Sequence, residues 1–163
     1  MMENDLLKNI NDYTKNIIIK AIENHNKAHL PKINDYRLIF LSKVIRDADK
    51  IDIYRIITQN YISEKPNNAV NLELSASYEI SENVCKSILN GQCVKYEDLK
   101  TITDLKILHL SWVYDINFIY TFERIKKEFY LEKIYNVLPK TKDTQLIYQK
   151  AMDFVAQKLK TID

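Results

Sequence analysis

The stretch from Leu38 to Ile57 constrains the fold more than any other part of the chain. Wound at about 100° per residue, it places one stripe of side chains on a single helix face: Leu38, Leu41, Ile45, Asp49, Asp52 and Ile56. Asp47 falls on the opposite side. A buried, ionised carboxylate costs several kcal/mol unless a metal, a cation or hydrogen bonds compensate it. The stretch therefore predicts a long helix that carries a site on its buried face.

Helical spacing and capping residues predict helices along most of the remaining chain. They cover residues 5–11, 12–25, 35–61, 81–90, 103–128, 131–138 and 144–162, with a helical turn at 96–100. Gly91 suits the position after the 81–90 helix, where φ is positive. Residues 63–77 form a turn-rich connection, and no window alternates with the period of a strand. We expect one all-α domain over residues 1–163, a bundle whose central, buried helix is 103–128.

Composition excludes several classes of function. The single glycine cannot build a phosphate-cradling loop or a dinucleotide fingerprint, and the net charge of +2 gives no argument for nucleic-acid binding. Cys85 and Cys93 lack metal-ligand spacing, which favours reduced thiols in a cytoplasmic protein. The most apolar long window, 107–122, is interrupted by polar residues. We therefore predict no disulfide, no nucleic-acid partner and no membrane span.

Two segments resemble a known superfamily. The run Ile45-Arg46-Asp47-Ala48-Asp49-Lys50-Ile51-Asp52, preceded by Ala21-Ile22-Glu23-Asn24-His25-Asn26-Lys27, is similar to the C-terminal part of the HD-domain metal-dependent phosphohydrolases. The similarity extends from about Ile17 to the C-terminus, and 112–118 resembles one bacterial branch. The family's early His and adjacent His-Asp pair do not occur here, since none of the three histidines is followed by Asp. The resemblance implies an HD-like helical bundle that is incomplete at its N-terminus.

The resemblance also implies roles for individual residues. Asp49 matches the Asp that supplies the last metal ligand, and His25 matches a His close to the metal. Asp52 would orient substrate or a ligand, while Arg46 and Lys50 would hold phosphoryl oxygens. The alternatives are a buried Asp49 paired with a cation, a satisfied core His25, and a local lattice of ion pairs along the helix.

Three further residues have mainly structural interpretations. His29, in the loop before Pro31, should be exposed, and His109, within the buried helix, should belong to the core. Asp115 should act as a structural hydrogen-bonding group.

The predicted function is metal-dependent hydrolysis of a phosphate ester, possibly a nucleotide, with weak or no activity in a chain that lacks part of the site. The metal would be Mn²⁺, Fe²⁺ or Mg²⁺ in a complete site, and this chain could hold none. The alternatives are a non-catalytic α-helical protein that binds a ligand or a partner, and a separate helical regulator. Because the helices missing from the bundle would leave apolar surface exposed, we also expect a homo-oligomer.

Overall fold

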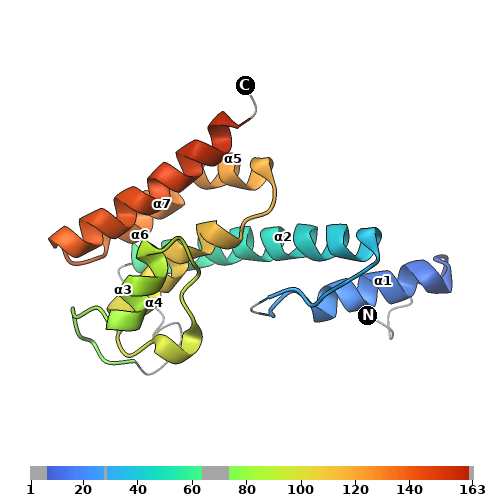
Figure 1. Ribbon diagram of the computed structural model, residues 1–163, viewed down its shortest axis with the longest axis horizontal. Coiled ribbons are helices and arrows are strands. Elements are labelled where there is room, and N and C mark those ends of the chain that lie inside the picture. The colour runs from blue at the N-terminus through green and yellow to red at the C-terminus, as the bar shows by residue number, and fades with distance from the viewer. Residues whose placement is uncertain (1–6, 28, 64–73, 162–163) are drawn as a thin grey trace. The chain divides into compact units, whose positions relative to one another are not determined.

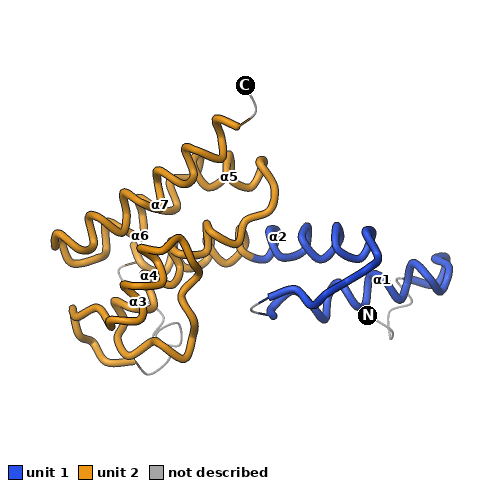
Figure 2. Tube along the Cα trace, in the orientation of Figure 1, with its two compact units in different colours: residues 1–49 blue, residues 50–163 orange. Residues whose placement is uncertain are grey.

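The computed structural model describes residues 7–27, 29–63 and 74–161 of the chain (Figure 1). Every regular element among these residues is a helix, which confirms the predicted all-α class. A single isolated bridge joins Ser75 to Thr101. The chain divides into two compact units, residues 1–49 and 50–163 (Figure 2). The expectation that 1–163 forms one domain stays a prediction.

Unit 1 consists of α1 (Asp12–Glu23) and the first part of α2 (Tyr36–Tyr61). Asn11 caps α1, since its side chain accepts a hydrogen bond from the Thr14 amide at 2.9 Å. Asp35 does the same for α2, and its Oδ1 accepts from the Arg37 amide at 2.9 Å. Such side chains satisfy amides that a helix start leaves without partners. The predicted start of α2 near residue 35 and its unbroken course to Tyr61 are both confirmed.

Unit 2 holds the rest of α2 and the remaining helices. These are α3 (Glu82–Leu89), η2 (Tyr96–Asp98), α4 (Ile102–Ser111), η3 (Trp112–Asp115), α5 (Ile119–Lys127), α6 (Tyr130–Asn136) and α7 (Lys142–Lys160). In Figure 1, α3 lies beside α4 and α6 lies beside α7, and the contacts between these pairs agree. Almost every residue of α4 is buried, so α4 is the central helix of this unit.

The predicted helix over 103–128 is wrong as a single element. The chain leaves α4 through the 3-10 turn η3, becomes extended at Ile116, and begins α5 after Phe118. Residues 113–121 are mostly β-branched, aromatic or Asx types, which have low helix propensity. The apolar pattern on all sides of this window therefore belongs to a buried α4 and to an α5 that buries one face.

The start of α4 is fixed by a carboxylate that is fully buried. Asp104 accepts hydrogen bonds from the amide and hydroxyl of Ser81, at 2.8 and 2.7 Å, and from the amides of Lys100 and Thr101, at 2.9 and 3.1 Å. With Thr101 it forms a capping box, two residues before the predicted cap at Thr103. This network joins the first residues of α3 to those of α4.

Other predicted boundaries shift by a few residues. Gly91 has φ +70° directly after the α3 cap, as expected. Helix α7 begins at Lys142 with Thr141 as its cap, not at Thr144. Phe129, between α5 and α6, has φ 55° and is 60% exposed, although the left-handed region is unusual for a bulky side chain. Residues 7–11 of the segment predicted as a helix over 5–11 form turns and a bend, so the described part of that segment holds no helix. Most of the predicted 63–77 connection lies outside the described residues.

Candidate functional site

The structure buries a different side of α2 from the one that the sequence pattern suggested. The buried residues are Ser42, Arg46, Asp47, Lys50, Tyr54, Ile57 and Thr58. Asp47, predicted to point outward, is only 3% exposed. Asp52, predicted to point inward, has a side chain 61% exposed and accepts a 2.8 Å hydrogen bond from Arg55. Asp49 is half-buried. Since α2 carries apolar side chains on several sides, its own sequence does not determine which side is covered.

Arg46 is 4% exposed, and its guanidinium donates hydrogen bonds to main-chain carbonyls of unit 1. Its Nη1 donates to the carbonyl oxygens of Asn24 at 3.4 Å, His25 at 3.1 Å and Lys27 at 2.5 Å. These carbonyls follow the last turn of α1, where a helix leaves acceptors unsatisfied and carries partial negative charge. The predicted phosphoryl-binding cation is thus bound to the main chain of residues 24–27.

Lys50 also has a partner within its own unit. Its Nζ lies 2.6 Å from Oδ2 of Asp115, and both side chains are largely buried. The predicted structural role of Asp115 as a hydrogen-bonding group is confirmed. The predicted lattice of short-range ion pairs around Lys50 is replaced by a contact with a residue far away in the sequence. Such a pair compensates the burial of both charges.

His25 follows the end of α1 and is half-buried. Its Nδ1 lies 2.6 Å from the carbonyl oxygen of Ile22. A carbonyl can only accept, so Nδ1 carries the hydrogen, and in the neutral ring Nε2 is left with a lone pair. Nε2 makes no hydrogen bond to another described residue. This arrangement is the one that metal-ligating histidines use.

The other two histidines lie where the sequence predicted. His29 is exposed, and His109 is 4% exposed within the core of unit 2. The Nδ1 of His109 shares a 2.8 Å hydrogen bond with the Tyr61 hydroxyl, and its carbonyl accepts from Tyr54 at 2.8 Å. Burial lowers the pKa of His109 to about 3, so its ring is neutral near pH 7. Burial also raises the pKa of Tyr61.

The described residues do not fit a complete divalent-metal site. No group of three or more His, Cys, Asp or Glu side chains gathers among them. His25 and Asp49, both in unit 1, supply at most two ligands of suitable chemistry. Asp52 is turned to solvent and paired with Arg55, so its predicted role near a metal has no support from its position.

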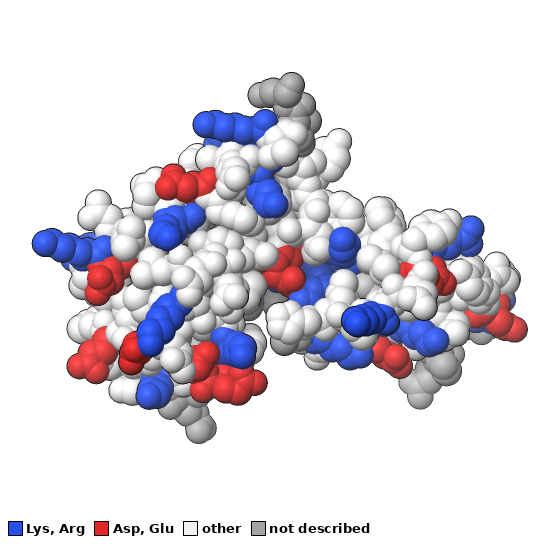
Figure 3. All heavy atoms as spheres, in the orientation of Figure 1, with Lys and Arg blue, Asp and Glu red and all other residues white. Residues whose placement is uncertain are grey.

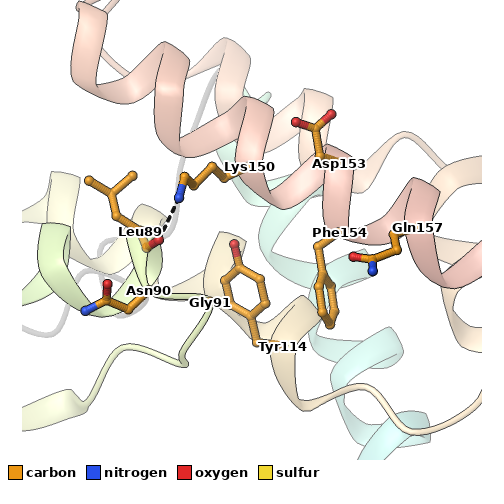
Figure 4. Close-up of a pocket in the computed structure, with 8 residues that line it drawn as sticks. All are labelled: Leu89, Asn90, Gly91, Tyr114, Lys150, Asp153, Phe154 and Gln157. Carbon is orange, nitrogen blue, oxygen red and sulfur yellow. Dashed lines mark hydrogen bonds between the residues drawn. The ribbon is translucent and has the colours of Figure 1, made fainter.

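A shallow hollow of about 340 Å³ lies in unit 2, between the end of α3, Tyr114 and one face of α7. Figure 4 shows Lys150 reaching from α7 to the Leu89 carbonyl, a 2.9 Å hydrogen bond. Beside it, the Tyr114 and Phe154 rings meet edge to face with centroids 4.8 Å apart. The hollow is close to the lower limit of volume for a small-molecule site, which is about 300 Å³. It could offer an aromatic wall and hydrogen-bonding groups to a small polar molecule.

One buried polar residue was missed by the sequence analysis. Ser42, on the buried side of α2, is 0% exposed, and its Oγ has no hydrogen-bond partner among the described residues. A serine between Leu41 and Lys43 in a helix carries no signal that its hydroxyl is unsatisfied, because that depends on which side of the helix is covered.

No family model, curated protein or solved structure matches the chain, so the comparison with known proteins identifies no relative. No helix in the described ranges is long and apolar enough to cross a membrane. On the face of unit 2 drawn in Figure 3, acidic and basic side chains are interspersed and form no wide area of one sign.

Proposed function

We propose that this chain is an HD-type helical protein of the metal-dependent phosphohydrolases, directed at a phosphate ester such as a nucleotide, with little hydrolytic activity of its own. The observation that supports it best is the state of His25. Its Nδ1 is bound to the Ile22 carbonyl, and its Nε2 is available as a ligand atom. The same unit contains Asp49, the residue matched to the family's last metal ligand.

The limited activity follows from counting ligands. In the family, a divalent ion such as Mn²⁺, Fe²⁺ or Mg²⁺ supplies the activation of a water molecule. This sequence has no His-Asp pair, and His25 with Asp49 is too small a set to hold such an ion tightly. We therefore expect weak binding of Mn²⁺ and turnover of phosphate esters close to background.

A pair of variants on one helix tests this function. Asp49→Asn should remove the weak Mn²⁺ binding measured by calorimetry, whereas Asp52→Asn should keep it, because the Asp52 side chain is exposed and paired with Arg55. Turnover of a general phosphodiester and a nucleotide panel is measured in parallel, with and without Mn²⁺. Equal loss in both variants would mean that the ion binds nonspecifically. Robust turnover abolished by Asp49→Asn would mean that further ligands exist.

A second function is favoured by the contacts of Arg46 and Lys50. The two cations expected to hold phosphoryl oxygens are bonded to carbonyls of residues 24–27 and to Asp115. This supports a non-catalytic protein that binds a ligand or a partner. We propose a homo-oligomer as one such assembly, because Tyr36 and Val44 present exposed apolar surface on α2. Sedimentation that shows only monomer at high concentration would contradict it.

A further inference from the structure

We infer that Arg46 is a positioning residue which holds His25 in the Nδ1–H tautomer and so keeps the Nε2 lone pair available for a ligand. The inference rests on the proposed function in giving His25 a ligand-binding role. It replaces the direct contact with phosphoryl oxygens that the sequence suggested for Arg46.

The first step in the argument is the environment of the Arg46 charge. A buried guanidinium is costly unless its donors are satisfied, and here they meet carbonyl oxygens of residues 24, 25 and 27. These acceptors sit at the C-terminal end of α1, where a positive charge is favourable. The attraction fixes the main chain of the turn that carries His25.

The second step concerns the geometry of the turn. The Ile22 carbonyl accepts from the His25 amide at 3.2 Å and from the His25 Nδ1 at 2.6 Å. Both bonds require the His25 backbone to fold back over the last turn of α1. Arg46, bonded to the His25 carbonyl at 3.1 Å, holds the backbone in that position. Lys27 adds a further contact within the turn, since its Nζ donates to the Asn24 side-chain oxygen at 2.7 Å.

The third step concerns what the tautomer achieves. A neutral imidazole can donate through one nitrogen and accept through the other. With Nδ1 donating to the Ile22 carbonyl, Nε2 presents a lone pair, which is the form that could bind a divalent cation or accept from a protonated phosphate oxygen. If the turn were released, Nδ1 would lose its acceptor and the ring would be free to carry its hydrogen on Nε2. The ligand-binding nitrogen would then be blocked in part of the molecules.

The test reads the tautomer directly, by ¹⁵N NMR of the histidine rings at a pH where they are neutral. In the natural protein, the His25 Nδ1 signal should be of the protonated type and Nε2 of the unprotonated type. Arg46→Ala should convert this to a mixture of the two tautomers. Arg46→Lys should restore the natural pattern in part, because an ammonium also donates to carbonyls. Arg55→Ala, on the same helix and exposed, should change nothing.

Two results would overturn the inference: a His25 ring that carries its hydrogen on Nε2 in the natural protein, or an unchanged tautomer in a folded Arg46→Ala protein. An Arg46→Lys protein whose tautomer mixture is no closer to the natural pattern than that of Arg46→Ala would also contradict it. Adding Zn²⁺ as a probe separates this inference from the function. A shift of the His25 Nε2 signal on Zn²⁺ addition supports a ligand role. If Arg46→Ala gives the expected mixture of tautomers but Zn²⁺ leaves the His25 Nε2 signal unchanged, Arg46 sets the tautomer and His25 has no metal-binding role.

Discussion

Replacing Ser42 by alanine should stabilise unit 1. The Ser42 hydroxyl is completely buried and has no hydrogen-bond partner among the described residues. An unsatisfied buried polar group costs about 1–3 kcal/mol. Alanine removes that cost and also has a helix propensity better by about 0.5 kcal/mol. Against these gains stands the small void left by one oxygen atom. We expect a net gain of about 1–2 kcal/mol in the free energy of unfolding.

Ser111→Ala is a matched control in the same chain. Ser111 is also 0% exposed at the end of a helix, but its Oγ accepts from the Val94 amide at 2.9 Å and donates to the Leu108 carbonyl at 2.7 Å. Its removal leaves the Val94 amide without a partner, so this substitution should destabilise unit 2 by about 1–3 kcal/mol. The same chemical change should therefore have opposite signs at the two positions.

Hydrogen–deuterium exchange with mass spectrometry measures each unit separately. Peptides from α1 and from residues 36–49 should exchange about tenfold more slowly in Ser42→Ala, since about 1.4 kcal/mol corresponds to a factor of ten. Peptides from α4 should exchange faster in Ser111→Ala. Faster exchange of unit 1 in Ser42→Ala would refute the reasoning, because it would mean that the hydroxyl makes a favourable bond, for example to a buried water molecule.

Three further predictions concern unit 2. Asp104→Ala should cost about 3 kcal/mol or more, because it leaves several buried donors unsatisfied, and chemical denaturation followed by Trp112 fluorescence measures the loss. Phe129→Gly should raise the melting temperature, since glycine adopts the left-handed conformation without the penalty of about 1–2 kcal/mol, and a lower melting temperature would show that the exposed ring makes a stabilising contact. Because burial lowers the pKa of His109 from 6.5 to about 3, the unfolded chain binds an extra proton between these values, so this residue's contribution to stability falls as pH decreases from about 6.5 toward 3. In His109→Gln the slope of stability against pH over that range should be smaller, and an unchanged slope would assign the pH dependence to other groups.

Local sequence determined the helices and most of their starts. Capping side chains such as Asn11 and Asp35 satisfy the first amides of a helix within a few residues of themselves. Gly91 suits the positive φ after α3 for an equally local reason, and no strand pattern competes with these signals. The break between α4 and α5 was not predicted. Apolar residues fall on all sides of a helix drawn through 103–128, and this pattern gives no sign that the backbone becomes extended at Ile116.

Tertiary structure alone decided what the polar residues of α2 do. The sequence of α2 places apolar residues on several sides of the helix. Which side is buried depends on contacts with segments far away in the sequence. Arg46 is bonded to the turn after α1, and Lys50 to Asp115, so neither has the role that its neighbours in the sequence suggested. Asp47 is buried and Asp52 is exposed because the covered side of α2 differs from the one that the sequence pattern suggested. A charged side chain is buried where its partners are, and the carbonyls bonded to Arg46 and the carboxylate bonded to Lys50 lie outside α2.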